Sequence, residues 1–281
     1  MSKKRWMNLI KVLSLCFILL ASLFSLKTKM AIVSNSANHY VTIAHRGGAG
    51  YAPENTMAAF NKAVEMKCDY LELDIQMSKE GEFVVIHDPT INRTTNVNTR
   101  KSIYVSDLTV AQLKQLDAGS YFGAEFYGER IPTLKEVLDE FSGKIGIIIE
   151  VKAPELYPGI EEKLAAILIG NELDKSNNSN IIIQSFNFQF VKKIRELLPE
   201  MTTAVIISKR RYLTDDYLKD FSAYADYVNT SRRLVTKQLV EKVHSHHMKM
   251  MSWTVRSKDQ ISPLMKAGVD GIITDYPDYV G

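Results

Sequence analysis

Residues 70–88 read YLELDIQMSKEGEFVVIHD, and this stretch begins as a strand with two different faces. Glu72 and Asp74 alternate with apolar residues, so the two acids point to one side of the strand and the apolar side chains to the other. Residues 145–151, IGIIIEV, repeat the pattern, with Glu150 near the end of a second apolar run. We expect the apolar faces to pack against helices and the acids to converge on the opposite side.

Strand-like and helix-like segments alternate along the chain on both sides of this stretch. Strands are expected at Val41–His45, Tyr70–Ile75, Ile145–Val151, Ile181–Phe186, Thr203–Ile207, Asp226–Asn229, Met250–Val255 and Gly271–Thr274. Helices are expected at Thr56–Met66, Leu134–Phe141, Ile160–Ile169, Phe188–Leu197, Asp215–Tyr224, Lys237–His247 and Lys258–Lys266. This alternation indicates βαβ units and a parallel sheet. Eight strands predict an α/β fold of the (β/α)₈ TIM-barrel type, and the alternative is a doubly wound open sheet.

One segment, residues 88–130, interrupts the alternation. It follows a second short strand at Glu82–His87 and contains no complete βα unit, only a short helix near Val110–Leu116. A loop of this length in a compact domain is usually functional or forms a small subdomain. We therefore expect residues 38–281 to form one barrel domain, with residues 88–130 inserted after the second strand on the face where barrels carry their active sites.

The composition is that of an ordinary globular protein. The 281 residues are 46% hydrophobic and 24% charged, with a net charge of +3. No long run of Lys and Arg occurs in the body of the chain, so we expect no nucleic-acid partner, and nothing implies a protein partner. Lys209-Arg210-Arg211 is interpreted as a solvated loop, although it follows a predicted strand and could reach an anionic substrate.

Residues 1–37 form a basic and then hydrophobic N-terminal segment. Lys3, Lys4 and Arg5 precede an uncharged apolar run from Val12 to Leu26. This run is short for a membrane span, for which about 20 residues are usual, so the segment is interpreted as a signal peptide or a signal anchor. The excess of positive charge before the run places the body of the chain outside the cytoplasm. We expect a protein that is anchored in the membrane with an extracellular domain, or secreted.

The acids Glu72, Asp74 and Glu150 are candidates for a metal site. Burial of an unpaired carboxylate is costly, so a cation is expected to meet them. A divalent cation that prefers hard oxygen ligands, Ca²⁺ or Mg²⁺, would satisfy all three. The alternative is a set of internal salt bridges with Lys152 or Arg46.

Two histidines and two permanent cations stand where predicted strands give way to loops. His45 ends the first strand, and His87 ends the short strand before the insertion. Neutral imidazoles at such positions suit a general acid and a general base. Arg46 and Lys152 are candidates for holding a phosphate, because a guanidinium can grip two oxygens and an ammonium supplies a point charge.

An ordered set of short motifs resembles one known family. The motifs are His45-Arg46-Gly47, Pro53-Glu54-Asn55-Thr56, Glu72-Leu73-Asp74, His87-Asp88, Arg93-Thr94-Thr95-Asn96, Ile131-Pro132-Thr133-Leu134, Glu150-Val151-Lys152, Gln184-Ser185-Phe186, Trp253-Thr254-Val255 and Thr274-Asp275. Each motif alone is weak, but the ordered set, from His45 to the C-terminus, looks like the glycerophosphodiester phosphodiesterase family.

The resemblance implies metal-dependent hydrolysis of a small glycerophosphodiester to sn-glycerol 3-phosphate and an alcohol. It implies that Glu72, Asp74 and Glu150 bind the metal, with Glu54 at or near the ligand shell. The other implied site residues are His45 and His87 as the acid–base pair, and Arg46 and Lys152 on the phosphate. Phe186 and Trp253 are further candidates, because their rings could pack on the glycerol carbons.

Two other functions remain as alternatives. A phospholipase D-like or phosphatidylinositol-cleaving phosphodiesterase acting on membrane lipid would use the same histidine pair and metal. An inactive, anchored binding protein belongs to another class and is disfavoured, because a competent residue fills every expected catalytic position. The cluster of His244, His246 and His247 is not interpreted as a metal site, since it precedes a strand and so lies at the opposite end of the barrel.

Overall fold

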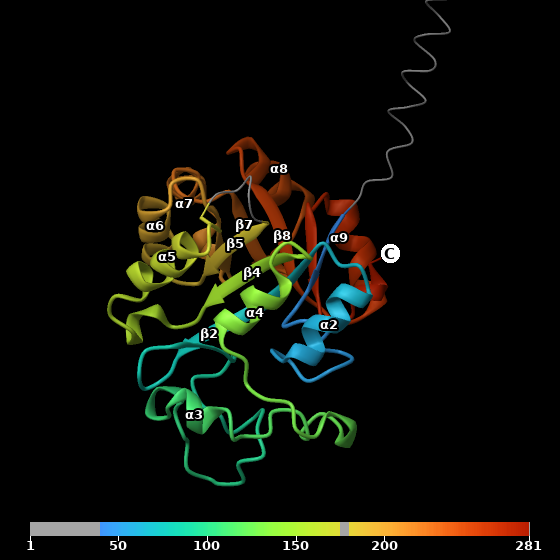
Figure 1. Cartoon of the computed structure of the whole chain (residues 1–281). Helices are drawn as coiled ribbons and strands as arrows, with labels where there is room; N and C mark the ends of the chain where they lie inside the picture. Colours follow the sequence, from blue (N-terminus) through green and yellow to red (C-terminus); the bar gives the residue numbers. More distant parts are fainter. Residues whose placement is uncertain (1–39, 175–179, 281) are drawn as a thin grey trace, which may run out of the picture. The chain divides into compact units, whose positions relative to one another are not determined.

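The computed structural model describes residues 40–174 and 180–280, which form a closed barrel of parallel strands (Figure 1). The barrel strands are β1 (Val41–Ala44), β2 (Tyr70–Met77), β4 (Gly146–Val151), β5 (Ile181–Ser185), β6 (Thr202–Ile207), β7 (Tyr227–Ser231), β8 (Lys249–Val255) and β9 (Gly271–Thr274). Each strand pairs in parallel with its neighbours, and β1 pairs with both β2 and β9, so the ring closes. The TIM-barrel prediction is confirmed. The open-sheet alternative is wrong, because each of the eight parallel strands has a parallel neighbour on both sides and the ring has no edge strand.

Helices connect the strands at the positions expected from the hydrophobic pattern. They are α2 (Met57–Glu65), α4 (Leu134–Phe141), α5 (Ile160–Gly170), α6 (Phe188–Leu197), α7 (Asp215–Phe221), α8 (Lys237–Ser245) and α9 (Ile261–Ala267). Several begin after a threonine whose hydroxyl accepts a hydrogen bond from the first turn, as Thr133 does in a capping box with Glu136. Helix α9 begins later than predicted, because Lys258–Gln260 forms a separate 3₁₀ turn.

The barrel interior is filled by an apolar layer that lies below the polar strand ends. This cluster consists of Ile43, Ile148, Ile182, Ala204, Met251 and Ile273. Residues two positions further along each strand point to the same side of the sheet, one step nearer its carboxyl end. These residues are His45, Glu150, Gln184, Ile206, Trp253 and Asp275. The two-residue period of the strands therefore places mainly polar and aromatic side chains next to the apolar layer, on the side of the carboxyl ends of the strands.

The segment between β3 (Phe83–Val85) and α4 adds no strand to the barrel. Strand β3 lies antiparallel on β2, and the following residues form the 3₁₀ turns η1 (Val105–Asp107) and η2 (Ala124–Phe126) and the short helix α3 (Val110–Leu113). Their buried side chains form a separate cluster, comprising Val84, Ile86, Ile91, Val105, Leu113, Ala118 and Ile131. In Figure 1 the part around α3 extends from one side of the barrel. A small subdomain is therefore inserted after the second barrel strand, and its bounds at residues 88–130 stay a prediction.

The N-terminal segment predicted at residues 1–37 lies outside the described residues. Within residues 40–174 and 180–280, no helix is long and apolar enough to cross a membrane. Export and anchoring therefore stay predictions from the sequence.

Gly47, directly after β1 and His45-Arg46, is expected to be essential for stability. It has φ of +80°, and a Cβ atom there would lie 2.5 Å from the backbone carbon of Ala59. Gly47→Ala should lower the free energy of unfolding by about 2–4 kcal/mol, combining backbone strain with a clash. Gly143 has φ of +77° with nothing within 4 Å of a built Cβ, so Gly143→Ala measures the strain alone. Urea unfolding of the two variants gives the comparison, and equal losses would contradict the predicted clash.

Candidate active site

The carboxyl ends of the strands surround a cavity of about 100 Å³ that brings together most of the expected site residues. Its lining consists of His45, Arg46, Glu72, His87, Glu150, Lys152, Gln184, Phe186, Ile206, Trp253, Thr254 and Ile273. Both histidines, both expected phosphate-binding cations and both expected aromatics therefore face one space. They come from strands far apart in sequence that meet because the ring is closed.

Three buried carboxylates form the floor of the site on its β2 and β4 side. Ligand atoms of Glu72, Asp74 and Glu150 all lie within 4.8 Å of one another. Glu72 Oε2 accepts a hydrogen bond from the backbone N–H of Arg46 at 2.8 Å. Asp74 is fixed by Asn55, whose amide donates to Asp74 Oδ2 at 2.9 Å while its oxygen accepts from the Asp74 N–H at 3.1 Å. Glu72 and Asp74 are thus held in place by the loop that follows β1.

Two cations partly neutralise the triad, as the salt-bridge alternative predicted. Lys152 Nζ contacts Glu150 and lies 3.3 Å from Asp74 Oδ1, and Arg46 Nε lies 3.3 Å from Asp74 Oδ2. Burial would raise the pKa of Asp74, but the charges of Lys152 and Arg46 outweigh it and hold that pKa below its usual value. Asp74 therefore keeps its negative charge at neutral pH.

The negative charges of Glu72 and Glu150 are less well balanced by nearby cations than the charge of Asp74. Burial raises the pKa of Glu72 well above its usual value, and the charges of Asp74 and Glu150 raise it further. Burial likewise raises the pKa of Glu150 to about 7, against the opposing effect of Lys152. Glu72 Oε1 is buried and has no hydrogen-bond partner among the described residues. Three acids against two cations, with one carboxylate oxygen unpartnered, fit a site for a divalent cation with oxygen ligands.

Each histidine is held at Nδ1 by an aspartate, which leaves Nε2 for chemistry. His45 Nδ1 lies 2.5 Å from Asp275 Oδ1, and His87 Nδ1 lies 2.6 Å from Asp88 Oδ1. Burial is the main cause that lowers the pKa of both histidines. An Nδ1–H that donates to a carboxylate leaves the neutral ring with an unprotonated Nε2.

Both aspartates are in turn bound by arginines. Arg256 Nε lies 2.5 Å from Asp275 Oδ2, and Arg93 Nε donates to Asp88 Oδ2 at 2.7 Å. The hydrogen bond from Arg93 contributes most to lowering the pKa of Asp88 to about 2. Both aspartates therefore stay charged and hold the ring of their histidine in a fixed orientation.

Glu54 lies between two guanidinium groups. Its Oε1 accepts from Arg46 and from Arg93, each at 2.7 Å, and its Oε2 accepts from Arg93 at 2.8 Å. These ion pairs connect the insertion to the loop after β1. Glu54 is not one of the three acids whose ligand atoms converge, so its place at the ligand shell stays a prediction.

An aromatic pair, Phe186 and Trp253, lines another part of the cavity. The rings of Phe186 and Trp253 meet edge to face, with centroids 5.6 Å apart. Trp253 Nε1 donates to the backbone oxygen of Asn229 at 3.0 Å, which fixes the indole, and Lys152 Nζ lies 5.6 Å from the centroid of Phe186. Phe186 remains 44% exposed, so its ring is available to the carbon atoms of a ligand.

No role was predicted from the sequence for Asn55, Asp88 or Asp275, although all three stand inside the quoted motifs. Asp88 directly follows His87, and Asp275 lies two residues beyond the interior-facing Ile273, so position alone could have indicated both. The role of Asn55 required the fold, because its contact with Asp74 depends on a backbone with φ of +58°.

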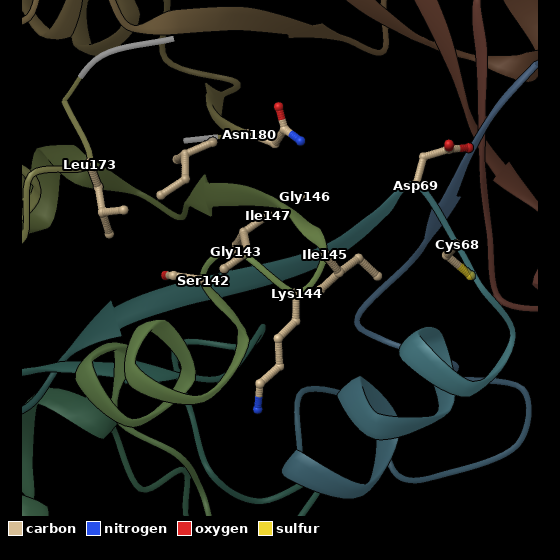
Figure 2. Close-up of a pocket in the computed structure, with 11 residues that line it drawn as sticks. Cys68, Asp69, Ser142, Gly143, Lys144, Ile145, Gly146, Ile147, Leu173 and Asn180 are labelled. Atoms are coloured by element: carbon tan, nitrogen blue, oxygen red, sulfur yellow. The ribbon is translucent and has the colours of Figure 1, made fainter. Parts of the chain in front are cut away.

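A second cavity, of about 350 Å³, lies at the other end of the strands (Figure 2). It is lined by residues that precede or begin β2, β4 and β5, including Asp69, Gly146 and Ile181. The expected catalytic residues do not line it. His244 also lies before a strand and pairs with Asp270 at 2.8 Å, which agrees with leaving it out of the site.

A closed parallel barrel with acidic, basic and imidazole groups around one cavity at the carboxyl ends of its strands defines a barrel enzyme. Residues 45–279 match the model of the glycerophosphoryl diester phosphodiesterase family. The chain belongs to this family, as its motifs indicated. Enzymes of the family generally depend on a divalent metal, and the acidic triad could bind one.

Individual relatives cover almost the whole described part of the chain. YhdW of Bacillus subtilis (strain 168) is 43% identical over 239 residues, which cover 85% of this chain and 95% of YhdW. A glycerophosphodiester phosphodiesterase of the same strain is 36% identical over 255 residues, or 86% of each chain. The structure of an Oleispira antarctica phosphodiesterase in complex with the product sn-glycerol-3-phosphate has a TM-score of 0.75 and 27% identity, over 85% of this chain and 94% of that one. The predicted phosphodiesterase activity on glycerophosphodiesters is thereby confirmed.

Proposed function

We propose that the chain uses a divalent cation, Ca²⁺ or Mg²⁺, to hydrolyse glycerophosphodiesters to sn-glycerol 3-phosphate and an alcohol. The observation that carries this proposal is the single cavity that joins the buried acidic triad to both histidines and to Arg46 and Lys152. The product bound by the Oleispira antarctica relative supports sn-glycerol 3-phosphate as the phosphate-bearing product.

The phosphate binds between Arg46 and Lys152. Both side chains face the cavity, and the nearby carboxylates keep the pKa of both groups above its usual value against the effect of burial. Each therefore stays charged as negative charge builds on the phosphate oxygens in the transition state. When bound by Glu72, Asp74 and Glu150, a divalent cation would add further positive charge at the same place.

The two histidines move protons through Nε2. One histidine, as the neutral ring, takes the proton from the attacking oxygen, which belongs to water or to the 2-hydroxyl of the glycerol. The other starts as the imidazolium, with a proton on Nε2, and gives that proton to the departing alcohol oxygen. Attack by the 2-hydroxyl forms a cyclic phosphate, which water then opens to glycerol phosphate. Either histidine can serve as the base, since both rings have the same arrangement at Nδ1.

Phe186 and Trp253 orient the substrate by contact with its glycerol carbons. Their edge-to-face packing gives a rigid apolar wall beside the charged groups, and a glycerol backbone is the part of the substrate that carries no charge. The N-terminal hydrophobic segment supports a place outside the cytoplasm, either anchored in the membrane or released.

Release of sn-glycerol 3-phosphate from glycerophosphocholine by the full-length protein tests the proposal. EDTA should abolish the release, and added Ca²⁺ or Mg²⁺ should restore it. Metal-independent release would contradict the proposed cofactor. A clear preference for intact or lyso-phospholipid over glycerophosphocholine would favour the lipid-cleaving alternative, and ligand binding without turnover of either would favour the binding protein.

Asp275→Asn tests whether the carboxylate beside His45 sets its proton affinity. Burial lowers the pKa of His45, whereas Asp275 raises it through its hydrogen bond and its charge. Asparagine can still accept from Nδ1 but is neutral, so the pKa of His45 should fall further. The limb of the kcat/KM pH profile that belongs to His45 should move to lower pH, and kcat should fall by about tenfold or more.

Asp259→Asn is the control for this variant, because Asp259 is exposed and follows β8 on the same side of the barrel. Its pH profile should match that of the unmodified protein. An unmoved profile in Asp275→Asn would show that Asp275 has no influence on the protonation of His45.

A further inference from the structure

Positive charge is concentrated in three loops of an otherwise acidic barrel. Six of the 35 basic residues precede Tyr40 and none of the 32 acidic residues does, so residues 40–281 hold 29 bases against 32 acids. The loops at 208–214, 232–236 and 256–260 nevertheless carry seven bases and a single acid, Asp259. We name these bases the basic half-rim; they are Lys209, Arg210, Arg211, Arg232, Arg233, Arg256 and Lys258.

The basic half-rim borders the candidate active site. Its loops leave the carboxyl ends of the neighbouring strands β6, β7 and β8. Ile206 and Trp253 line the cavity, and Lys209 and Arg256 follow them by three residues, a span of at most about 10 Å of chain. Ser231 pairs in register with Trp253, so Arg232 begins its loop at the level of the indole. Long basic side chains at these positions can reach a ligand that protrudes from the cavity.

Four of these bases have no acidic partner. Among the described residues, no ion pair is formed by Lys209, Arg210, Arg232 or Arg233. All of these side chains except that of Arg232 are exposed. The other three are held in place: Arg256 pairs with Asp275, Arg211 lies 4.8 Å from the ring centroid of Tyr212, and Lys258 lies 5.1 Å from that of Tyr279.

Elsewhere on the rim, bases do not outnumber acids. The insertion at 88–130 carries five bases and five acids, and Arg93 there is already paired with Glu54 and Asp88. The residues after β9 are acidic, with Asp275 and Asp278. The charge around the cavity is therefore one-sided, which would guide an anionic group toward β6–β8.

We propose that the basic half-rim binds a second negatively charged group of the substrate, so that the preferred glycerophosphodiesters carry a further phosphate on the alcohol. This inference rests on the proposed function and specifies its substrate class. The cavity of about 100 Å³ is small beside the roughly 300–1,000 Å³ of typical ligand pockets, so one arm of the diester must extend over the rim. A phosphate on that arm gains contacts with the exposed bases of the half-rim, whereas the same bases repel the quaternary ammonium of choline.

The partner is the substrate and not an anionic lipid surface, because the half-rim is continuous with the catalytic groups. Arg256 binds the same carboxylate, Asp275, that holds His45. An anion drawn to this side of the rim is therefore drawn to the reacting centre. Binding to vesicles is the competing outcome that the experiment must separate.

The test compares two substrates of the full-length protein: glycerophosphocholine and glycerophosphoglycerol with a terminal phosphate. The variant replaces the four unpaired bases by glutamine, as K209Q/R210Q/R232Q/R233Q. The variant should lose about tenfold or more in kcat/KM for the phosphate-bearing substrate, mainly through KM, because exposed ion pairs each contribute modestly. Its kcat/KM for glycerophosphocholine should change by less than about twofold or rise. High salt should also weaken the preference of the unmodified protein for the phosphate-bearing substrate.

Arg100 and Lys101 supply the matched control. Both are exposed on the insertion, and neither forms an ion pair among the described residues, so R100Q/K101Q should leave both substrates unaffected. Equal kinetics of the unmodified protein on both substrates, or equal losses in the fourfold variant, would overturn the inference while the phosphodiesterase activity stands. Failure to hydrolyse either substrate would instead reject the proposed function. If the fourfold variant loses binding to vesicles of anionic phospholipid but keeps the substrate preference of the unmodified protein, the inference is overturned and the basic half-rim binds the membrane instead.

Discussion

Replacing either His45 or His87 by alanine is expected to lower kcat by about 10²-fold or more, with little change in KM. The expectation follows from the position of both rings at the cavity and from their contacts at Nδ1, which leave Nε2 for proton transfer. General acid–base catalysis by one positioned group contributes roughly 10²–10⁴-fold. Steady-state kinetics with glycerophosphocholine, at several pH values, measure the loss.

The two single variants should also differ in their pH profiles, because each retains one titrating imidazole. One should lose the acidic limb of the profile and the other the alkaline limb, which assigns the base and the acid. His244→Ala is the control, since His244 lies at the opposite end of the barrel and pairs with Asp270. Activity within a fewfold of the unmodified protein in both His45→Ala and His87→Ala would remove the histidines from the mechanism.

Glu72→Gln is expected to abolish the response to divalent metal. Glutamine keeps the acceptor for the Arg46 N–H but lacks the negative charge that a hard cation requires. Because a bound metal stabilises the transition state by several kcal/mol, its loss should lower kcat by roughly 10²–10³-fold. Melting temperatures give a second measurement, because a ligand that binds only the folded state raises the temperature of unfolding. Ca²⁺ or Mg²⁺ should raise that temperature for the unmodified protein but not for the variant.

The same substitution should stabilise the metal-free protein. Burial raises the pKa of Glu72 well above its usual value, so at neutral pH this acid destabilises the folded state relative to the unfolded state, in which the carboxylate is hydrated. A carboxyl group with a raised pKa contributes stability that is fully present below the pKa of the unfolded chain and is lost as pH rises from that value to the raised pKa of the folded state. In EDTA at neutral pH, Glu72→Gln should therefore melt at a higher temperature than the unmodified protein.

Glu155→Gln is the control for this pair of effects, because Glu155 is exposed in the loop after β4 and makes one weak contact with Asn187 at 3.3 Å. It should change neither the metal response nor the melting temperature in EDTA. A metal response retained by Glu72→Gln would exclude Glu72 as a ligand. Glu54→Gln tests whether Glu54 also binds the metal: loss of the metal response in this variant would add Glu54 to the ligands.

The fold was largely readable from the sequence because its signals are local. Alternating apolar and polar residues place Glu72 and Asp74 on one face of β2, whatever surrounds the strand. Helix starts such as Thr133 carry their own hydrogen-bond partners within one turn. The end of α7 was less predictable, since the residues after Phe221 turn away to bury Tyr224 and Ala225 in the barrel packing.

Sequence alone determined the barrel, the two histidines, the acidic triad and their order along the chain, because each depends on residue type and on the period of a strand. The tertiary structure decided the rest. Closure of the ring brings β9 beside β1, so that Asp275 meets His45 across 230 positions. The backbone of the loop after β1 turns at Asn55, so that its amide meets Asp74. Pairing of β6, β7 and β8 gathers three short basic segments on one side of the cavity. Contacts of this kind depend on distances in space, and those distances exist only once all eight strands are paired.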